Sequence, residues 1–153
     1  MNESVKILGN LKIVKKDKDN NIVETRTIPN LVVNTGKAFI AERVVRDTAN
    51  APQSMALGDD ATTPIGSQTA LVSELSGRAN ALPTVGTFSN TISSNTITFT
   101  GTFAGGLATG TLREAAIFDS PNTGGTMLCR TTFSDVTKGA SDIVTVTWNI
   151  TVA

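Results

Sequence analysis

The carboxy-terminal stretch from Asp142 to Val152, D-I-V-T-V-T-W-N-I-T-V, is the feature that most constrains how this chain folds. Five of its apolar residues share one parity, with threonine or asparagine between them: Val144, Val146, Trp148, Ile150 and Val152. A period of two predicts a β-strand with one buried and one solvent-facing side. A strand this apolar and uncharged would aggregate if its edge were exposed. We therefore expect it to be paired on both sides, with the rest of the chain supplying its partners and an opposing layer.

The chain has 153 residues, which is enough for one domain with its own core. Hydrophobic residues make up 39% and charged residues 17%, a balance typical of a thin-layered all-β domain rather than a helical enzyme. The alternating segments described below amount to about eight or nine strands. We predict a single all-β domain over residues 1–153, with one short helix, as an antiparallel β-sandwich or jelly-roll-like fold.

Several residue types and sequence features are absent, and this reduces the classes of function to consider. The chain has no histidine, the commonest general base and transition-metal ligand, and its single cysteine, Cys129, precludes an intrachain disulfide. Thirteen basic residues balance thirteen acidic ones, so the positive field that binds nucleic acid is missing. No apolar run reaches membrane-spanning length, and the amino terminus has no signal-peptide core. We expect no cofactor, metal, nucleic acid or membrane partner, and a protein that stays in the cytosol or leaves it only within something larger.

The amino-terminal segment predicts a hairpin. Residues 4–14 alternate, residues 22–28 alternate less cleanly, and the charged run K-K-D-K-D-N-N between them ends in two asparagines that suit a turn. A functional interpretation would make this run an anion-binding patch that consists of Lys15, Lys16 and Lys18. The aspartates between these lysines favour a solvated hairpin tip instead. We therefore interpret residues 1–28 as a hairpin, or an arm that reaches a partner.

A single helix is expected next. Leu31 to Val33 reads as a short strand, and Thr35 as the N-cap of a helix from Gly36 to about Asp47. Its buried stripe would contain Phe39, Ile40, Val44 and Ala41. One helix among many strands should plug an end or cover a face of the sandwich.

The segment after the short strand Ser54–Leu57 contains a pair of aspartates. Asp59 and Asp60 are calcium-ligand candidates, but they are adjacent, and no liganding glutamate follows at a loop-closing distance. A turn with two solvated carboxylates is the simpler interpretation. Ser67 or Thr69 would then cap one or two helical turns.

The remaining segments predict strands. Arg78 to Phe88 looks extended, and Asn95 to Phe103 alternates, with Gly101 as a possible bulge. Thr111–Asp119 and Thr126–Phe133 flank the turn-rich S-P-N-T-G-G and predict a hairpin. With the final strand, they would form an antiparallel meander.

No catalytic arrangement emerges from these segments. Without histidine no Ser-His or Cys-His pair exists, and Glu74 and Glu114 are the carboxylates worth testing. Each is more simply explained by a structural hydrogen bond or ion pair, with Arg78 or Arg113 as partner. Cys129 reads as a small core residue, with Arg130 pointing the other way. We expect no enzyme activity.

Two long segments carry a resemblance. The first is L-V-V-N-T-G-K-A-F-I-A-E-R-V followed by M-A-L-G-D-D-A-T-T-P-I-G-S-Q-T-A-L-V-S-E-L-S-G-R. The second is T-L-R-E-A-A-I-F-D-S-P-N-T-G-G-T-M-L-C-R-T-T-F-S-D-V-T-K followed by the terminal strand. The order of these motifs and the residues within them resemble small structural proteins of tailed bacteriophages, over about residues 30–152. Asp59, Asp60 and Ala116 depart from glycine-containing positions of that family.

This resemblance implies a virion structural protein. We expect a capsid decoration (cement) protein that binds the major capsid protein or other virion proteins as a homo-oligomer, with a trimer favoured over a dimer. Deleting residues 1–28 should then abolish shell binding while leaving the domain folded. The alternative is a tail, neck or short tail-fibre component involved in host attachment. A carbohydrate-binding sandwich is a third hypothesis, and it requires Trp148 to be exposed.

Overall fold

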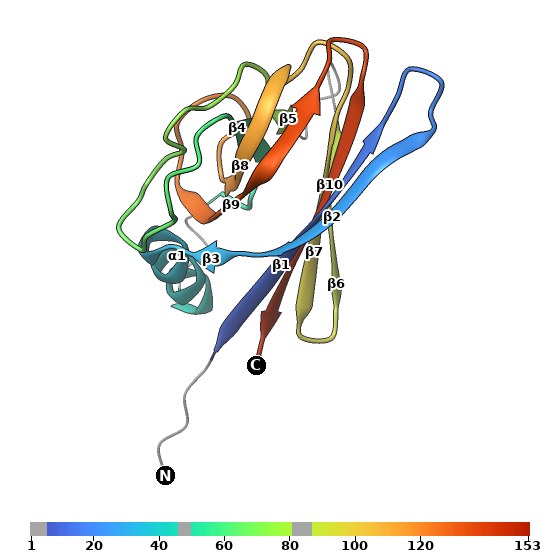
Figure 1. The fold of residues 1–153 in the computed structure, drawn as a ribbon. Helices are drawn as coiled ribbons and strands as arrows, with labels where there is room; N and C mark the ends of the chain where they lie inside the picture. The colour runs from blue at the N-terminus through green and yellow to red at the C-terminus, as the bar shows by residue number, and fades with distance from the viewer. Residues whose placement is uncertain (1–5, 46–49, 81–86) are drawn as a thin grey trace.

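The chain folds as a sandwich of two five-stranded antiparallel sheets (Figure 1). The computed structural model describes residues 6–45, 50–80 and 87–153. Sheet A has the order β2 (Ile22–Pro29), β1 (Ile7–Lys16), β10 (Ile143–Val152), β7 (Thr96–Phe103) and β6 (Thr87–Ser93). Sheet B has the order β3 (Leu31–Val32), β9 (Met127–Lys138), β8 (Gly110–Phe118), β4 (Ser54–Gly58) and β5 (Ala79–Asn80). The predicted all-β sandwich is confirmed, with ten strands in the described residues.

The terminal strand β10 lies at the centre of sheet A, as its apolar face predicts. It pairs antiparallel with β1 on one side and with β7 on the other, so both of its edges are covered. Its inward residues Val144, Val146, Trp148 and Ile150 are at most 1% exposed. Val152 is the exception at 40% exposed, because it lies at the open end of the sheet, and its predicted burial is wrong.

The burial of Trp148 leads to a spectroscopic prediction. Trp148 is the single tryptophan and is 0% exposed, so it cannot serve as a stacking platform for sugar rings. We expect its emission to be blue-shifted and resistant to acrylamide quenching in the native protein. The same protein in denaturant is the control and should emit as free indole does. Native emission typical of solvated indole would contradict the position of β10.

The core between the sheets is built from the inward faces of both layers. Sheet A contributes the aromatic rings of Phe88, Phe99 and Phe103 beside Trp148, and sheet B contributes smaller side chains such as Ala115. Gly101 is buried in β7 without a shift of register, so the predicted bulge is wrong. A Cβ on Gly101 would lie 3.2 Å from the Met55 side chain, so this glycine lets sheet B approach closely.

The predicted three-strand meander is wrong. Strands β8 and β9 form a hairpin in sheet B, but the chain then crosses to sheet A, where β10 pairs with β1 and β7. The crossing turn is held by Asp142, whose carboxylate accepts the Gly139 N–H at 2.8 Å and contacts Lys15 Nζ at 3.2 Å. These contacts lower the pKa of the Asp142 carboxyl, the Gly139 hydrogen bond first.

The amino-terminal hairpin forms, but it is an integral part of sheet A. Strand β1 pairs with β10 from Ile7 to Lys16, and Leu11 and Ile13 are buried in the main core. The hairpin tip turns at Asn20, which adopts a left-handed conformation with φ of 67°. This position leads us to predict that the domain does not fold without residues 1–28, in contrast to the expectation from the sequence.

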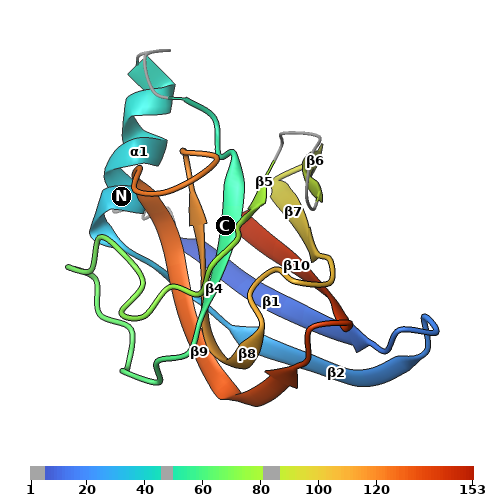
Figure 2. The ribbon, with the colours of Figure 1, turned by 90° about the horizontal axis from the view of Figure 1, so that it is seen from above.

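Helix α1 (Asn34–Val45) packs beside β9 at one end of the sandwich (Figure 2). It begins before the predicted start, and the Thr35 hydroxyl donates to the Met127 carbonyl at 2.7 Å instead of capping the helix. Gly36 is required here, because a Cβ would lie 1.8 Å from the Leu128 carbonyl oxygen. Phe39 and Ile40 pack against the core as predicted, whereas Ala41 is exposed. The side chain of Val44 lies outside the described residues.

Two further segments differ from the sequence-based expectations. The segment after β4 contains no helical turn at Ser67 or Thr69, and residues 59–78 form a long irregular loop. The extended stretch predicted from Arg78 to Phe88 agrees with β5 near its start and with the first residues of β6 at its end, and residues 81–86 lie outside the described part. The rest of β6, residues 89–93, was not predicted.

Candidate functional surfaces

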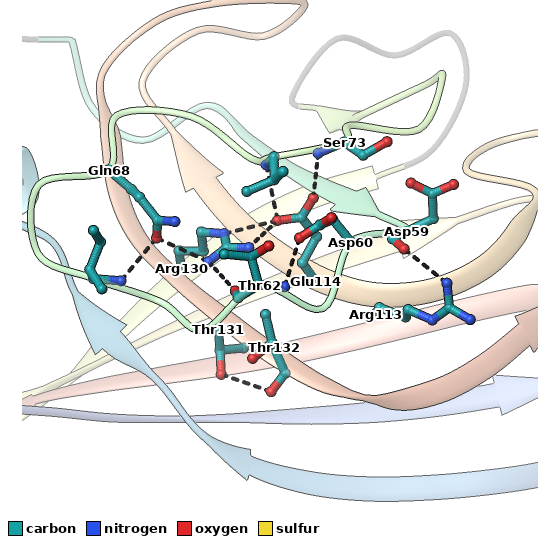
Figure 3. A network of polar contacts seen from close by, with 12 residues as sticks. Asp59, Asp60, Thr62, Gln68, Ser73, Arg113, Glu114, Arg130, Thr131 and Thr132 are labelled. Carbon is teal, nitrogen blue, oxygen red and sulfur yellow. Dashed lines mark hydrogen bonds and ion pairs between the residues drawn. The ribbon is translucent and has the colours of Figure 1, made fainter.

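A buried ion pair on the outer side of sheet B organises the polar contacts in Figure 3. Glu114 in β8 and Arg130 in β9 are both 0% exposed, and Arg130 Nε donates to Glu114 Oε2 at 2.8 Å. Arg130 Nη2 approaches the same oxygen at 2.6 Å without hydrogen-bond alignment. Glu114 was a candidate acid with Arg113 as its expected partner. The structure corrects this expectation, because Arg130 is the partner.

The ion pair fastens the loop of residues 59–78 onto sheet B. Glu114 accepts the Ser73 N–H at 2.7 Å, and Arg130 Nη1 donates to the Thr62 carbonyl and to Gln68 Oε1, both at 3.0 Å. Gly58 permits this approach, since a Cβ there would lie 2.4 Å from the Ser73 carbonyl oxygen. These contacts hold the loop against β8 and β9.

A small apolar cluster lies under the same loop. Leu71 from the loop joins Val33, which lies between β3 and α1, and four residues on the outer side of β4, β8 and β9: Ala56, Ala116, Phe118 and Met127. The loop therefore forms a partial third layer that is fixed by both apolar burial and the ion pair.

Asp59 and Asp60 take part in turn contacts. The Asp60 carboxylate accepts the Thr62 N–H at 2.6 Å, and hydrogen bonds from Thr62 lower its pKa. The Asp59 carbonyl accepts a hydrogen bond from Arg113 Nη1 at 3.2 Å. Among the described residues no group of three or more acidic or cysteine side chains is placed to hold a metal ion.

Arg113 forms its main contact with Asp135. The two side chains make a bidentate pair at 2.8 and 3.0 Å on an exposed part of the β8–β9 hairpin. This pairing raises the pKa of Arg113 and lowers that of Asp135.

Glu74 pairs with Arg78, as expected. The contact is bidentate at 2.7 and 2.8 Å, and the Arg78 guanidinium stacks on the Phe118 ring at 3.9 Å from its centroid. Arg78 also donates to the Gly124 carbonyl at 3.0 Å, which ties the loop to the β8–β9 turn. An open cleft of about 590 Å³ lies beside this pair.

Three lysines near the tip of the amino-terminal hairpin each have a polar or acidic partner. Lys15 contacts Asp142, Lys16 donates to Asn20 at 3.0 Å, and Lys18 contacts Asp19 at 3.0 Å. The three therefore do not gather into an anion patch, as the interleaved aspartates indicate.

Cys129 is fully buried in the main core. Burial raises the pKa of its thiol well above the usual range, which disfavours the nucleophilic thiolate. The interpretation of Cys129 as a core residue agrees with this position.

The outer side of sheet A carries a regular array of hydroxyl and amide groups, here called the threonine face. On β7 and β10 it consists of Thr96, Thr98, Thr100, Thr102, Thr145, Thr147, Asn149 and Thr151. Cross-strand hydrogen bonds link Thr96 to Thr151 at 2.9 Å and Thr98 to Asn149 at 2.8 Å. The described helix and the loop of residues 59–78 pack on sheet B (Figure 2), so neither of them covers this face.

An apolar groove of about 340 Å³ lies between α1 and sheet A. Its lining includes Phe39 of the helix, Leu128 of β9 and Ile92 of β6. Sequence reasoning missed this groove, because it depends on how the helix sits relative to strands distant in the sequence.

Comparisons with known proteins gave no match, whether with protein-family models, curated proteins or solved structures. Among the described residues no helix is long and apolar enough to cross a bilayer.

Proposed function

We propose that this protein is a structural component of a tailed-bacteriophage virion, a capsid decoration protein that binds the assembled shell and stabilises it. Its partner is the major capsid protein, and its contact surface is the threonine face. The resemblance of residues 30–152 to phage structural proteins supports the virion context, and the candidate acids Glu74 and Glu114 support a non-catalytic protein because each is paired with an arginine.

The observation that carries this proposal is the regular spacing of the hydroxyl groups on the threonine face. Neighbouring strands lie about 4.8 Å apart and alternate residues about 6.7 Å apart, so the outward hydroxyls form a regular two-dimensional array. Hydrogen bonds between the strands hold these short side chains in place before any partner binds. Binding through them sacrifices little side-chain entropy compared with binding through long charged side chains.

The charge of the chain fits a covering module. Its formal net charge is zero, and the threonine face on β7 and β10 contains no charged residue. Such a surface binds by shape and hydrogen bonds instead of by long-range attraction. Many copies on one shell would raise the total binding strength through multivalency.

A charge-neutral double substitution tests the contact surface. Thr100→Lys with Thr147→Glu places opposite charges directly across β7 and β10, so sheet A should tolerate them while the face changes. We expect binding to purified shells of the source phage, measured by co-sedimentation, to weaken at least about tenfold. The matched control is Thr111→Lys with Thr137→Glu, an equivalent cross-strand pair in sheet B. Its shell binding should stay at the wild-type level.

Copy number in a purified particle tests the assignment itself. Hundreds of copies on the shell would support the role of a capsid decoration protein. A handful of copies at the vertex or tail would instead favour a tail or neck component. Absence of the protein from the particle would overturn both.

A further inference from the structure

Among the described strands, β6 lies at one edge of sheet A and has no strand on its outer side. It pairs with β7 on one side and is the last strand in the order of the sheet (Figure 1). Six of its seven residues are exposed, and Phe88 is the exception because it stacks on Phe99 with ring centroids 5.8 Å apart. The backbone groups on the outer side of such a strand are available for pairing with another strand.

The other edge strands of the two sheets are protected. Strand β2 carries Glu24 and Arg26, ends at Pro29, and borders an irregularity in the β1 register at Lys15 and Lys16. Strands β3 and β5 are only two residues long. Charges, proline, irregular register and shortness are the usual means of preventing edge-to-edge pairing. Among the described strands, β6 is the long edge that has none of them.

The sequence of β6 is complementary to itself when read antiparallel. Around Asn90 as the centre of T-F-S-N-T-I-S, Ser89 mirrors Thr91, Phe88 mirrors Ile92, and Thr87 mirrors Ser93. Hydroxyl residues thus face hydroxyl residues on the outer side, and apolar residues face apolar residues on the inner side. Antiparallel cross-strand pairs of these kinds stabilise a sheet.

We propose that a second copy of this chain binds at β6, with the two β6 strands antiparallel about a two-fold axis through Asn90. The two copies of sheet A then form one continuous ten-stranded sheet. Ile92, which is 74% exposed in a single copy, lies opposite Phe88 of the other copy. The Asn90 side chain meets its own symmetry mate, and an amide can both donate to and accept from another amide.

The dimer has a consequence for the surfaces on either side of the joint. The outward residues of β6 extend the threonine face, so pairing makes the two faces continuous across the axis. On the inner side, Asn90 and Ile92 line the apolar groove beside α1, so the groove of each copy ends at the dimer interface. Because one strand pair is small compared with a standard interface of about 1,600 Å², we expect a concentration-dependent equilibrium rather than a permanent dimer.

Cysteine cross-linking tests the register. Residues directly opposite in an antiparallel pair have Cα atoms about 4.5 or 5.5 Å apart, within the range that a disulfide spans. Asn90→Cys should therefore cross-link efficiently under mild oxidation, since the native Cys129 is buried. Ser89→Cys alone should cross-link poorly, because two copies of position 89 are diagonal neighbours. A mixture of Ser89→Cys and Thr91→Cys chains should give the mixed disulfide.

A charge placed at the two-fold axis tests how strongly the β6 strands associate when no disulfide links them. Asn90→Lys places two like charges opposite each other, and we expect the dimer dissociation constant in sedimentation velocity to rise at least about tenfold. The matched control, Thr25→Lys on the opposite edge of sheet A, should leave it within about twofold. Circular dichroism of both variants checks that the fold is retained.

These measurements use the purified protein alone, so they do not depend on the proposed function. A wild-type chain that stays monomeric at several hundred micromolar would overturn the proposal. A trimer, or a dimer unaffected by Asn90→Lys and not trapped by Asn90→Cys, would overturn it equally.

Discussion

A chain that lacks residues 1–28 is expected to be unfolded in isolation. The deletion removes β1 and β2, and with them the whole ladder on one side of β10. It also removes Leu11 and Ile13, whose side chains are 0% and 1% exposed in the main core. Truncating a buried leucine or isoleucine to alanine costs about 2–5 kcal/mol, and a whole domain is stable by only about 5–15 kcal/mol.

The truncated chain should also aggregate. Removing β1 exposes one edge of β10, which carries no charged residue and is apolar along its inner side. Circular dichroism, amide-proton dispersion and sedimentation would show the loss of native sheet. Adding a peptide of residues 1–28 in trans should restore part of the native signal, because the missing strands can pair with the exposed edge.

A tip variant separates the role of the strands from that of the tip charges. Lys18→Ala with Asp19→Ala removes two side chains that are 74% and 63% exposed and contact mainly each other. This variant should keep the native stability, since exposed ion pairs contribute little. A truncated chain that folds cooperatively with the Trp148 emission of the intact protein would refute the integral position of the hairpin.

Local periodicity explains which elements of the fold were predictable. The alternation in Asp142–Val152 indicated the inward set of β10, and Phe39 and Ile40 indicated the buried side of α1, because both patterns depend only on nearby residues. Periodicity does not identify strand partners. The sequence therefore favoured pairing β10 with its neighbour β9, whereas a two-layer sandwich places it in the opposite sheet.

The failure to predict most of strand β6 has a different cause. Its inward parity includes Asn90 between Phe88 and Ile92, so the apolar alternation is interrupted. The same asparagine is central to the self-complementarity of the strand. A position that weakens the strand signal in the sequence is thus the one on which the proposed pairing is centred.

The partner of Glu114 was not predictable from sequence proximity. Arg113 is adjacent in sequence, but adjacent residues in a strand point to opposite sides. The register shift between Leu112 and Glu114 places Glu114 opposite Thr132, which makes Arg130 its diagonal neighbour on the same side. The register of the β8–β9 hairpin would have identified Arg130 as the partner of Glu114. Two irregularities in that register prevented its prediction from the sequence.

Replacing Arg130 with methionine is expected to destabilise the protein by about 3–5 kcal/mol, because it leaves the Glu114 carboxylate buried without its counter-charge. The loop of residues 59–78 would also lose the contacts from Arg130 to Thr62 and Gln68, so limited proteolysis should cut it faster. Urea denaturation monitored by Trp148 fluorescence measures the first effect. Arg113→Met is the matched control on the same hairpin, and its solvated pair with Asp135 predicts a much smaller change.

A double substitution distinguishes an unpaired charge from lost loop contacts as the source of the destabilisation. Glu114→Leu with Arg130→Met removes both charges, and replacing a whole buried ion pair by apolar groups is often nearly neutral. We expect the double variant to regain most of the stability lost by Arg130→Met, although Glu114→Leu also removes the acceptor of the Ser73 N–H. A double variant no more stable than the single one would assign the loss to the loop contacts. An Arg130→Met protein as stable as wild type would refute the buried pair altogether.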